Sequence, residues 1–135
     1  MNAHVVTVVA PAGWIRSNDH THWRNRHNLT AAWRTAATFA ARKANVPTLD
    51  AALITATVHR DDNRRYDLDG ITPTVKACID GLRDAGVLSE DHCDIVRSLT
   101  IEPGDTWADA ALVLHITPTT PRIRGAVTTR QGKTA

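Results

Sequence analysis

The stretch AALITATVHRDDNRRYDLDGITPTVKACIDGLRDAG, residues 51–86, predicts the centre of the fold. Its first ten residues alternate between two sets of side chains, which is the period of a strand with one better-buried face. Further along, Thr72 and Pro73 mark a helix start, because a hydroxyl group can cap the helix and a proline at its first position loses no hydrogen bond. Gly86 supplies the end of the helix. The stretch therefore predicts a strand followed by a helix.

The predicted helix has one apolar face. Its apolar side chains recur at helical spacing, at Val75, Cys78, Ile79 and Leu82. Cys78 belongs to this buried face, and the only other cysteine is Cys93. Two cysteines so placed fit a reduced cytoplasmic protein better than a disulfide scaffold.

Strands and a helix are predicted on both sides of this stretch. The β-branched run HVVTVVA (4–10) predicts a strand, and apolar residues at helical spacing predict a helix over 30–44. The segments CDIVRSLTIEP (93–103) and WADAALVLHITP (107–118) predict two strands, most simply an antiparallel hairpin. The long polar segment between the first strand and the first helix predicts a loop.

We therefore expect one α+β domain over residues 1–117, with a small mixed β-sheet and two helices in the order β-α-β-α-β-β. A length of 135 residues suits a single domain. After it, residues 118–135 are basic and contain no acid, which predicts a mobile basic tail.

The composition excludes several classes of protein. No segment approaches the roughly 20 apolar residues of a membrane span, and no secretion signal is visible. We expect a soluble protein of the cytoplasm that has no membrane partner. The sequence contains no phosphate-binding P-loop, glycine-rich dinucleotide turn or GxSxG motif. A net charge of +2 is too small by itself to indicate a nucleic-acid-binding protein.

Two carboxylates follow the predicted central strand. Asp67 and Asp69 are two residues apart, so in an extended chain both would point to one side, about 7 Å apart. Like charges in this arrangement favour a cation between them, and Mg²⁺ takes one or two carboxylates while it keeps several waters. We expect Mg²⁺ here, with Mn²⁺ as the alternative. A calcium EF-hand is excluded, because its first and last ligand positions would be Arg65 and Lys76.

Other charged residues could complete such a site. Asp91 can return to the start of the helix and supply a third carboxylate, since the connection from Gly86 is long enough when extended. Lys76 would then lie beside the acids and stabilise developing negative charge. The candidate phosphate contacts are Arg24, Arg26, Arg64 and Arg65.

The same residues also fit purely structural roles. Asp67 and Asp69 could be turn residues before a helix. Lys76 and Asp80 could form a solvated pair one helical turn apart. Asp91 could belong to a polar loop. Composition and spacing alone leave both interpretations open.

Three segments resemble the signature of RusA-type Holliday junction resolvases, small endonucleases of phages and prophages. RRYDLDG, VKACIDGLRDAGVL and SED are similar to that family's arginine-rich lead, D-x-D pair, lysine-containing helix and following acidic pair. The similarity is close over about residues 60–100. It implies that Asp67, Asp69 and Asp91 bind the catalytic metal, that Lys76 is the catalytic lysine and that the protein is a homodimer.

The expected function is Mg²⁺-dependent cleavage of four-way DNA junctions by paired symmetric nicks, in DNA recombination and repair within a bacterial host cell. Two alternatives remain. The chain could be a catalytically inactive module that binds branched DNA, or a nuclease that acts on another branched DNA such as a flap or a fork.

Overall fold

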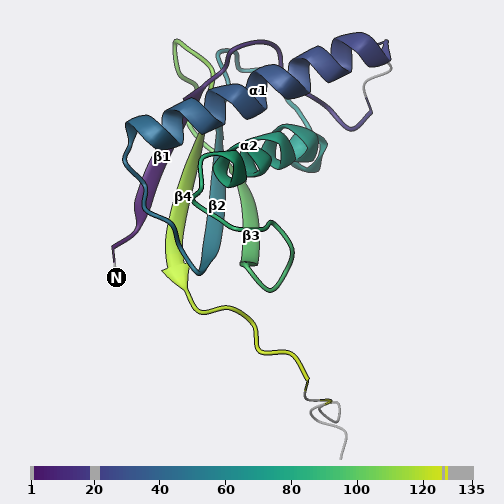
Figure 1. Cartoon of the computed structure of the whole chain (residues 1–135). Helices are drawn as coiled ribbons and strands as arrows, with labels where there is room; N and C mark the ends of the chain where they lie inside the picture. Colours follow the sequence, from purple (N-terminus) through teal and green to yellow (C-terminus); the bar gives the residue numbers. More distant parts are fainter. Residues whose placement is uncertain (1, 19–21, 126, 128–135) are drawn as a thin grey trace, which may run out of the picture.

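A computed structural model describes residues 2–18, 22–125 and 127 (Figure 1). Its elements are, in chain order, β1 (His4–Val9), α1 (Trp23–Lys43), β2 (Ala51–His59), the 3-10 helix η1 (Leu68–Ile71), α2 (Thr72–Asp84), β3 (Val96–Pro103) and β4 (Ala111–Thr119). The expected α+β class, with a mixed sheet and two helices, is confirmed, and η1 is added to the expected order.

The four strands form one sheet in the order β1-β4-β2-β3. β4 pairs antiparallel with both β1 and β2, so β1 and β2 run in the same direction. β3 pairs with β2 in parallel. Parallel neighbours need a crossover connection, and α2 provides it. The carboxyl ends of β1, β2 and β3 therefore meet at one edge of the sheet.

The predicted hairpin between the last two strands is wrong. β3 and β4 follow each other in the sequence, but β2 lies between them in the sheet. The burial of the two strands gives the physical reason. Ala111–Leu114 of β4 are buried, whereas β3 is mostly exposed. The more apolar strand occupies an inner position, where two neighbouring strands satisfy its backbone, and the more polar strand forms an edge.

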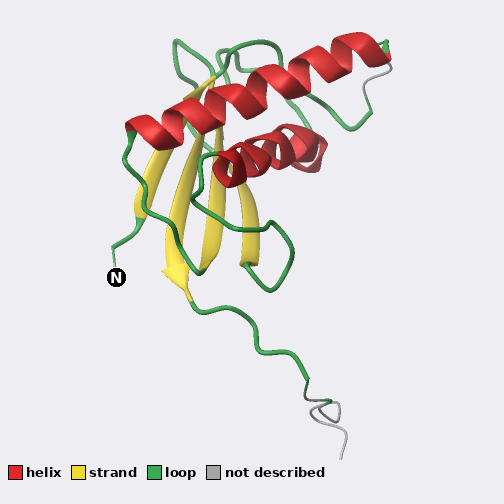
Figure 2. Cartoon of the chain, viewed as in Figure 1, coloured by secondary structure: helices red, strands yellow, loops and turns green. Residues whose placement is uncertain are grey.

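Both helices pack on the same face of the sheet (Figure 2). Between them and the sheet lies the core, to which the alternate residues Ala52, Ile54, Ala56 and Val58 of β2 contribute, as the sequence predicts. Trp33 of α1 is fully buried, and its ring stacks on Trp14 with centroids 5.0 Å apart. Within the described residues, no helix has the length and apolar character needed to cross a bilayer.

The first helix begins at Trp23, not at Thr30 as expected. The side chain of His22 caps it, because its Nδ1 accepts a hydrogen bond of 3.2 Å from the N–H of Arg24. The first turns of α1 are largely exposed, so they show no apolar stripe that periodicity could detect. The loop between β1 and α1 is therefore shorter than the sequence predicts.

The second helix has the expected apolar face and end, but a different start. Val75, Cys78, Ile79 and Leu82 are all buried, and burial raises the pKa of the Cys78 thiol. Gly86 has a φ of +80°, the left-handed conformation that ends many helices. Thr72 is the first helical residue rather than the cap, and its hydroxyl donates to the Asp69 carbonyl at 2.6 Å.

The contact between α1 and α2 depends on Gly81. A Cβ atom at this position would lie 2.5 Å from the Arg34 carbonyl oxygen and 2.7 Å from the Ala37 Cβ. We expect Gly81→Ala to lower the free energy of unfolding by about 1–3 kcal/mol, because the helices must move apart. Urea unfolding measures the change.

Gly13→Ala is the matched control, because a Cβ at Gly13 would meet nothing within 4 Å. We expect this variant to unfold within about 0.5 kcal/mol of the wild type. Equal unfolding midpoints for the Gly81 variant and the wild type would contradict the close helix contact.

Candidate functional site

The predicted carboxylates lie in the connection between β2 and α2. Asp67 is extended, with φ −84° and ψ 122°, and Asp69 lies within η1. The segment is therefore not extended through both residues, and the expected strand-like geometry is wrong. Its physical cause is the 3-10 turn that leads directly into α2. Even so, both exposed aspartates line one surface hollow of about 380 Å³.

The loop between β1 and α1 supplies another part of the lining of this hollow. Arg16, Ser17 and Asn18 line it together with residues 65–67 and 69–71. None of these three loop residues is among the site residues predicted from the sequence. Their only signal was the length of the loop, since long loops are often functional.

Buried hydrogen bonds fasten the loop to the start of α2. The Ile15 N–H donates to the Thr74 hydroxyl oxygen at 2.8 Å, and the Thr74 hydroxyl donates to the Ile15 carbonyl at 2.9 Å. The Ser17 N–H donates to the Gly70 carbonyl at 3.0 Å. Arg26 donates to the Arg16 carbonyl at 2.8 Å. The backbone of the loop is thus fixed beside the two aspartates.

Charges of both signs around the hollow are left without ion-pair partners. Within the described residues, Asp67 and Asp69 form no ion pair, and neither do Arg16 and Arg65. The carboxylates are therefore available to a cation, and the guanidinium groups are available to an anion such as a phosphate.

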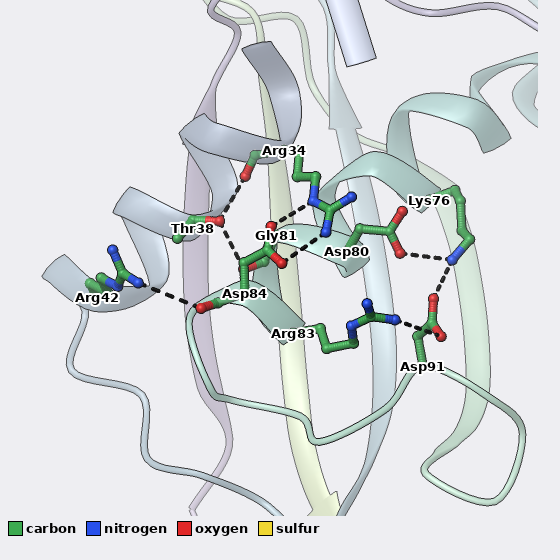
Figure 3. A network of polar contacts seen from close by, with 9 residues as sticks. All are labelled: Arg34, Thr38, Arg42, Lys76, Asp80, Gly81, Arg83, Asp84 and Asp91. Atoms are coloured by element: carbon green, nitrogen blue, oxygen red, sulfur yellow. Dashed lines mark hydrogen bonds and ion pairs between the residues drawn. The ribbon is translucent and has the colours of Figure 1, made fainter. Parts of the chain in front are cut away.

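Lys76 and Asp91 meet on the outer side of α2 (Figure 3). The Lys76 ammonium donates to Asp91 and, at 2.8 Å, to Asp80. Arg83 lies 3.7 Å from the other Asp91 oxygen. Asp91 thus lies alongside α2, between Lys76 and Arg83, and it does not line the hollow of Asp67 and Asp69. The Lys76–Asp80 pair one turn apart is confirmed. Neither Asp67 nor Asp69 is an ion-pair partner of Lys76 in the described part of the chain.

The ion pairs shift the ionisation of both groups. The hydrogen bond from Lys76 lowers the pKa of Asp91 to about 2. Partial burial favours the neutral form of Lys76, but its bonds to Asp80 and Asp91 outweigh this and raise its pKa. Both groups therefore stay charged at neutral pH.

Another face of α2 is joined to α1. Arg34 binds the Asp84 carboxylate through two hydrogen bonds, of 2.5 and 2.8 Å, and Thr38 donates to the Gly81 carbonyl at 3.0 Å (Figure 3). These contacts hold the helix that carries Lys76 in place against α1.

The three predicted metal ligands do not form one cage. Across residues 2–18, 22–125 and 127, no three His, Cys, Asp or Glu side chains are grouped closely enough to hold an ion. Asp67 and Asp69 share a hollow, whereas Asp91 is bound by Lys76 and Arg83. Two carboxylates that leave room for water suit Mg²⁺, which retains several water ligands in most protein sites. Asp67 and Asp69 supply carboxylate oxygens, the ligand type that Mg²⁺ takes.

The predicted phosphate contacts occupy two places. Arg24 and Arg26 lie in the first turns of α1, where the Arg24 guanidinium is 5.4 Å from the centre of the Trp23 ring. Arg64 and Arg65 line a second hollow, of about 610 Å³, and Arg65 also lines the first. The structure brings Arg65, Asp67 and Asp69 together, and it places Arg26 against the loop that completes their hollow.

The segment after β4 begins against the α2–β3 connection. The Arg122 N–H donates to the Asp94 carbonyl at 3.0 Å, and the Arg124 side chain forms an ion pair with Asp94. The basic residues Arg130 and Lys133 of the predicted tail lie outside the described residues.

No model of a known protein family matches the chain, and a search of curated proteins also finds no match.

Thr74 is expected to hold the loop that carries Arg16. Thr74→Val keeps the shape of the side chain but leaves the buried N–H and carbonyl of Ile15 without their partner. We expect a loss of about 1–3 kcal/mol in the free energy of unfolding, measured in urea. Thr35→Val, on the exposed side of α1, is the control and should change it by less than about 0.5 kcal/mol. Equal losses in both variants would contradict the role of Thr74.

The ion pair of Asp91 gives a pH prediction. Because its pKa of about 2 in the folded protein lies below the ordinary value of 3.8, the pair stabilises the fold above about pH 4 and loses this effect as the pH falls toward 2. Lys76→Met should raise the pKa of Asp91 toward 3.8, as measured by NMR of the carboxyl carbon. Lys43→Met, in the last turn of α1, should leave it unchanged. An unaltered Asp91 pKa without Lys76 would show that the pair does not form in solution.

Proposed function

We propose that this protein is a Mg²⁺-dependent endonuclease that resolves four-way DNA junctions by paired nicks. One observation carries the proposal. The hollow beside η1 brings together two carboxylates and two arginines, Arg16 and Arg65, none of which forms an ion pair within the part of the chain that the structure describes. A phosphodiester and a divalent cation are the pair of partners that satisfies both signs of charge in one site.

In this proposal each group has a distinct task. Asp67 and Asp69 would hold Mg²⁺. When bound, the ion supplies charge that activates water and stabilises the departing oxygen. Arg65 binds the oxygens of the phosphate that is cut and orients its phosphorus for in-line attack, and Arg16 binds the same DNA strand. The water oxygen forms a new bond to phosphorus and loses a proton to solvent, the bond from phosphorus to one sugar oxygen breaks, and that oxygen gains a proton from solvent.

Lys76 adds positive charge at the start of α2. Its ammonium stays protonated because Asp80 and Asp91 are hydrogen-bonded to it. In the structure Asp91 holds Lys76, so a role of Asp91 as the third metal ligand requires that this pair opens. Arg24, Arg26 and Arg64 extend the basic surface for DNA beyond the site. These contacts are directed at phosphates, so affinity should fall steeply with salt.

The resemblance to RusA-type resolvases supports the choice of a four-way junction as the substrate. It also supports a homodimer, because a two-fold symmetric enzyme places two equivalent sites on the symmetric arms of a junction. Cleavage of both strands then needs no second enzyme.

The ion pairs of Asp91 with Lys76 and Arg83 favour a second candidate function. With Asp91 bound by Lys76 and Arg83, only two of the three predicted ligands share a hollow. A protein that binds branched DNA without cutting it would have the same arrangement. Flaps and forks remain alternative substrates for an active enzyme.

Asp69→Asn tests the proposed activity, because it keeps the shape of the side chain and removes one charge. With Mg²⁺ and a labelled four-way junction, we expect the wild type to make paired symmetric nicks. The variant should cut at least about a hundredfold more slowly and still bind the junction without metal. Asp50→Asn, at an exposed position before β2, is the control and should cut normally.

Parallel reactions with a flap, a fork and a linear duplex decide the substrate. If the wild type binds the junction but no substrate is cut with Mg²⁺ or Mn²⁺, the protein is a binding module. If it cuts flaps or forks faster than junctions at equal salt, the activity is nucleolytic but the proposed substrate is wrong.

A further inference from the structure

Two surface hollows share one short segment as part of their lining. The first, of about 380 Å³, is lined by Asp67 and Asp69 and by the loop residues Arg16 to Asn18. The second, of about 610 Å³, is lined by residues 63–68 and Pro103. Residues 65–67 line both hollows. We call these three residues the ridge.

The ridge is supported from inside the protein. Arg60 is only 7% exposed, and its guanidinium lies 4.8 Å from the centre of the Tyr66 ring. Arg60 also forms an ion pair of 3.3 Å with Asp62, and the Asp62 carboxylate accepts a hydrogen bond of 3.0 Å from the Arg64 N–H. A buried cation beneath an aromatic ring adds to this support. The contacts of Arg60 and Asp62 therefore hold the backbone and the Tyr66 ring of this segment in place.

Arginine side chains line both hollows. Arg16 lines only the first hollow, Arg64 lines only the second, and Arg65 lines both. In the part of the chain that the structure describes, none of the three forms an ion pair. Asp67, a proposed metal ligand, is on the ridge itself and lines both hollows.

This arrangement suits the interior of a DNA strand. An internal phosphodiester has a nucleotide on each side, so a site that cuts it needs space and phosphate contacts in both directions. A phosphate at a strand end, or a single nucleotide, would use only one of the two hollows.

We propose that one DNA strand crosses the ridge, with the phosphate to be cut at Asp67 and with Arg16 and Arg64 contacting the neighbouring phosphates on opposite sides of it. The inference rests on the proposed nuclease function and assigns to it a strand path and two binding residues. Arg65 contacts the central phosphate, because it alone of the three arginines lines both hollows.

The test measures binding, so it does not depend on cleavage. A four-way junction is prepared with one neutral methylphosphonate at a time, at each phosphate within three positions of a cutting site. The cutting sites are those found for the wild type. If the wild type cuts nothing, every phosphate near the branch point is made neutral in turn. Dissociation constants are measured without divalent metal for the wild type, Arg16→Gln, Arg64→Gln and the control Arg97→Gln. Arg97 belongs to β3 and lines neither hollow.

We expect neutral phosphates on either side of the central one to weaken binding by the wild type roughly tenfold each. The affinity of Arg16→Gln should not change when a phosphate on one side of the central phosphate is made neutral, but it should still fall for a neutral phosphate on the other side. For Arg64→Gln the two sides should be exchanged. Each variant should reduce the slope of log affinity against log salt by about 1, because one phosphate contact is lost. Arg97→Gln should keep the full wild-type pattern.

Two results would overturn the strand path. In the first, Arg16→Gln and Arg64→Gln lose sensitivity at the same side. In the second, both keep the wild-type pattern. Because the pattern is measured in metal-free complexes, a protein that binds in the expected way but never cuts would contradict the nuclease function and leave the strand path supported.

Discussion

The parallel pairing of β2 with β3 is the constraint on which the rest of the structure depends. Parallel neighbours cannot be joined by a tight turn, so the chain leaves the end of β2, returns through α2 and enters β3 from the same side as β2. The connection that carries Asp67 and Asp69 therefore lies at the carboxyl edge of the sheet, where ligand sites of such units commonly form.

The same constraint explains how the loop after β1 reaches this connection. β4 is inserted between β1 and β2 and runs against both, so these two strands are parallel and end at the same edge. Thr74 then joins to Ile15 across 59 residues of sequence. Arg16, the next residue, is brought beside the aspartates. Gly81 lets α2 pack closely enough on α1 to keep this edge in place.

The distribution of ion pairs separates two regions of charge. On the outer side of α2, Lys76 and Asp91 satisfy each other, which keeps both ionised. At the hollow, carboxylates and guanidinium groups stand without partners in the described residues. Unpaired charges cost little at an exposed surface, where water solvates them, and they can pair with a substrate and a cation on binding. The contrast is the physical basis for placing the proposed chemistry at the hollow.

The sequence by itself determined the local features. The alternation in β2, the apolar stripe of α2 and the stop at Gly86 follow from side-chain periodicity and backbone freedom, which act over a few residues. The motif residues Asp67, Asp69, Lys76 and Asp91 could also be selected by spacing. The start of α1 could not be predicted, because its first turns pack against little and carry no periodic signal. Only the tertiary structure decided the inner position of β4, the arrival of Arg16 at the aspartates and the pairing of Asp91 with Lys76. Each of these depends on competition among distant segments for burial and for partners, and no local pattern encodes the outcome of that competition.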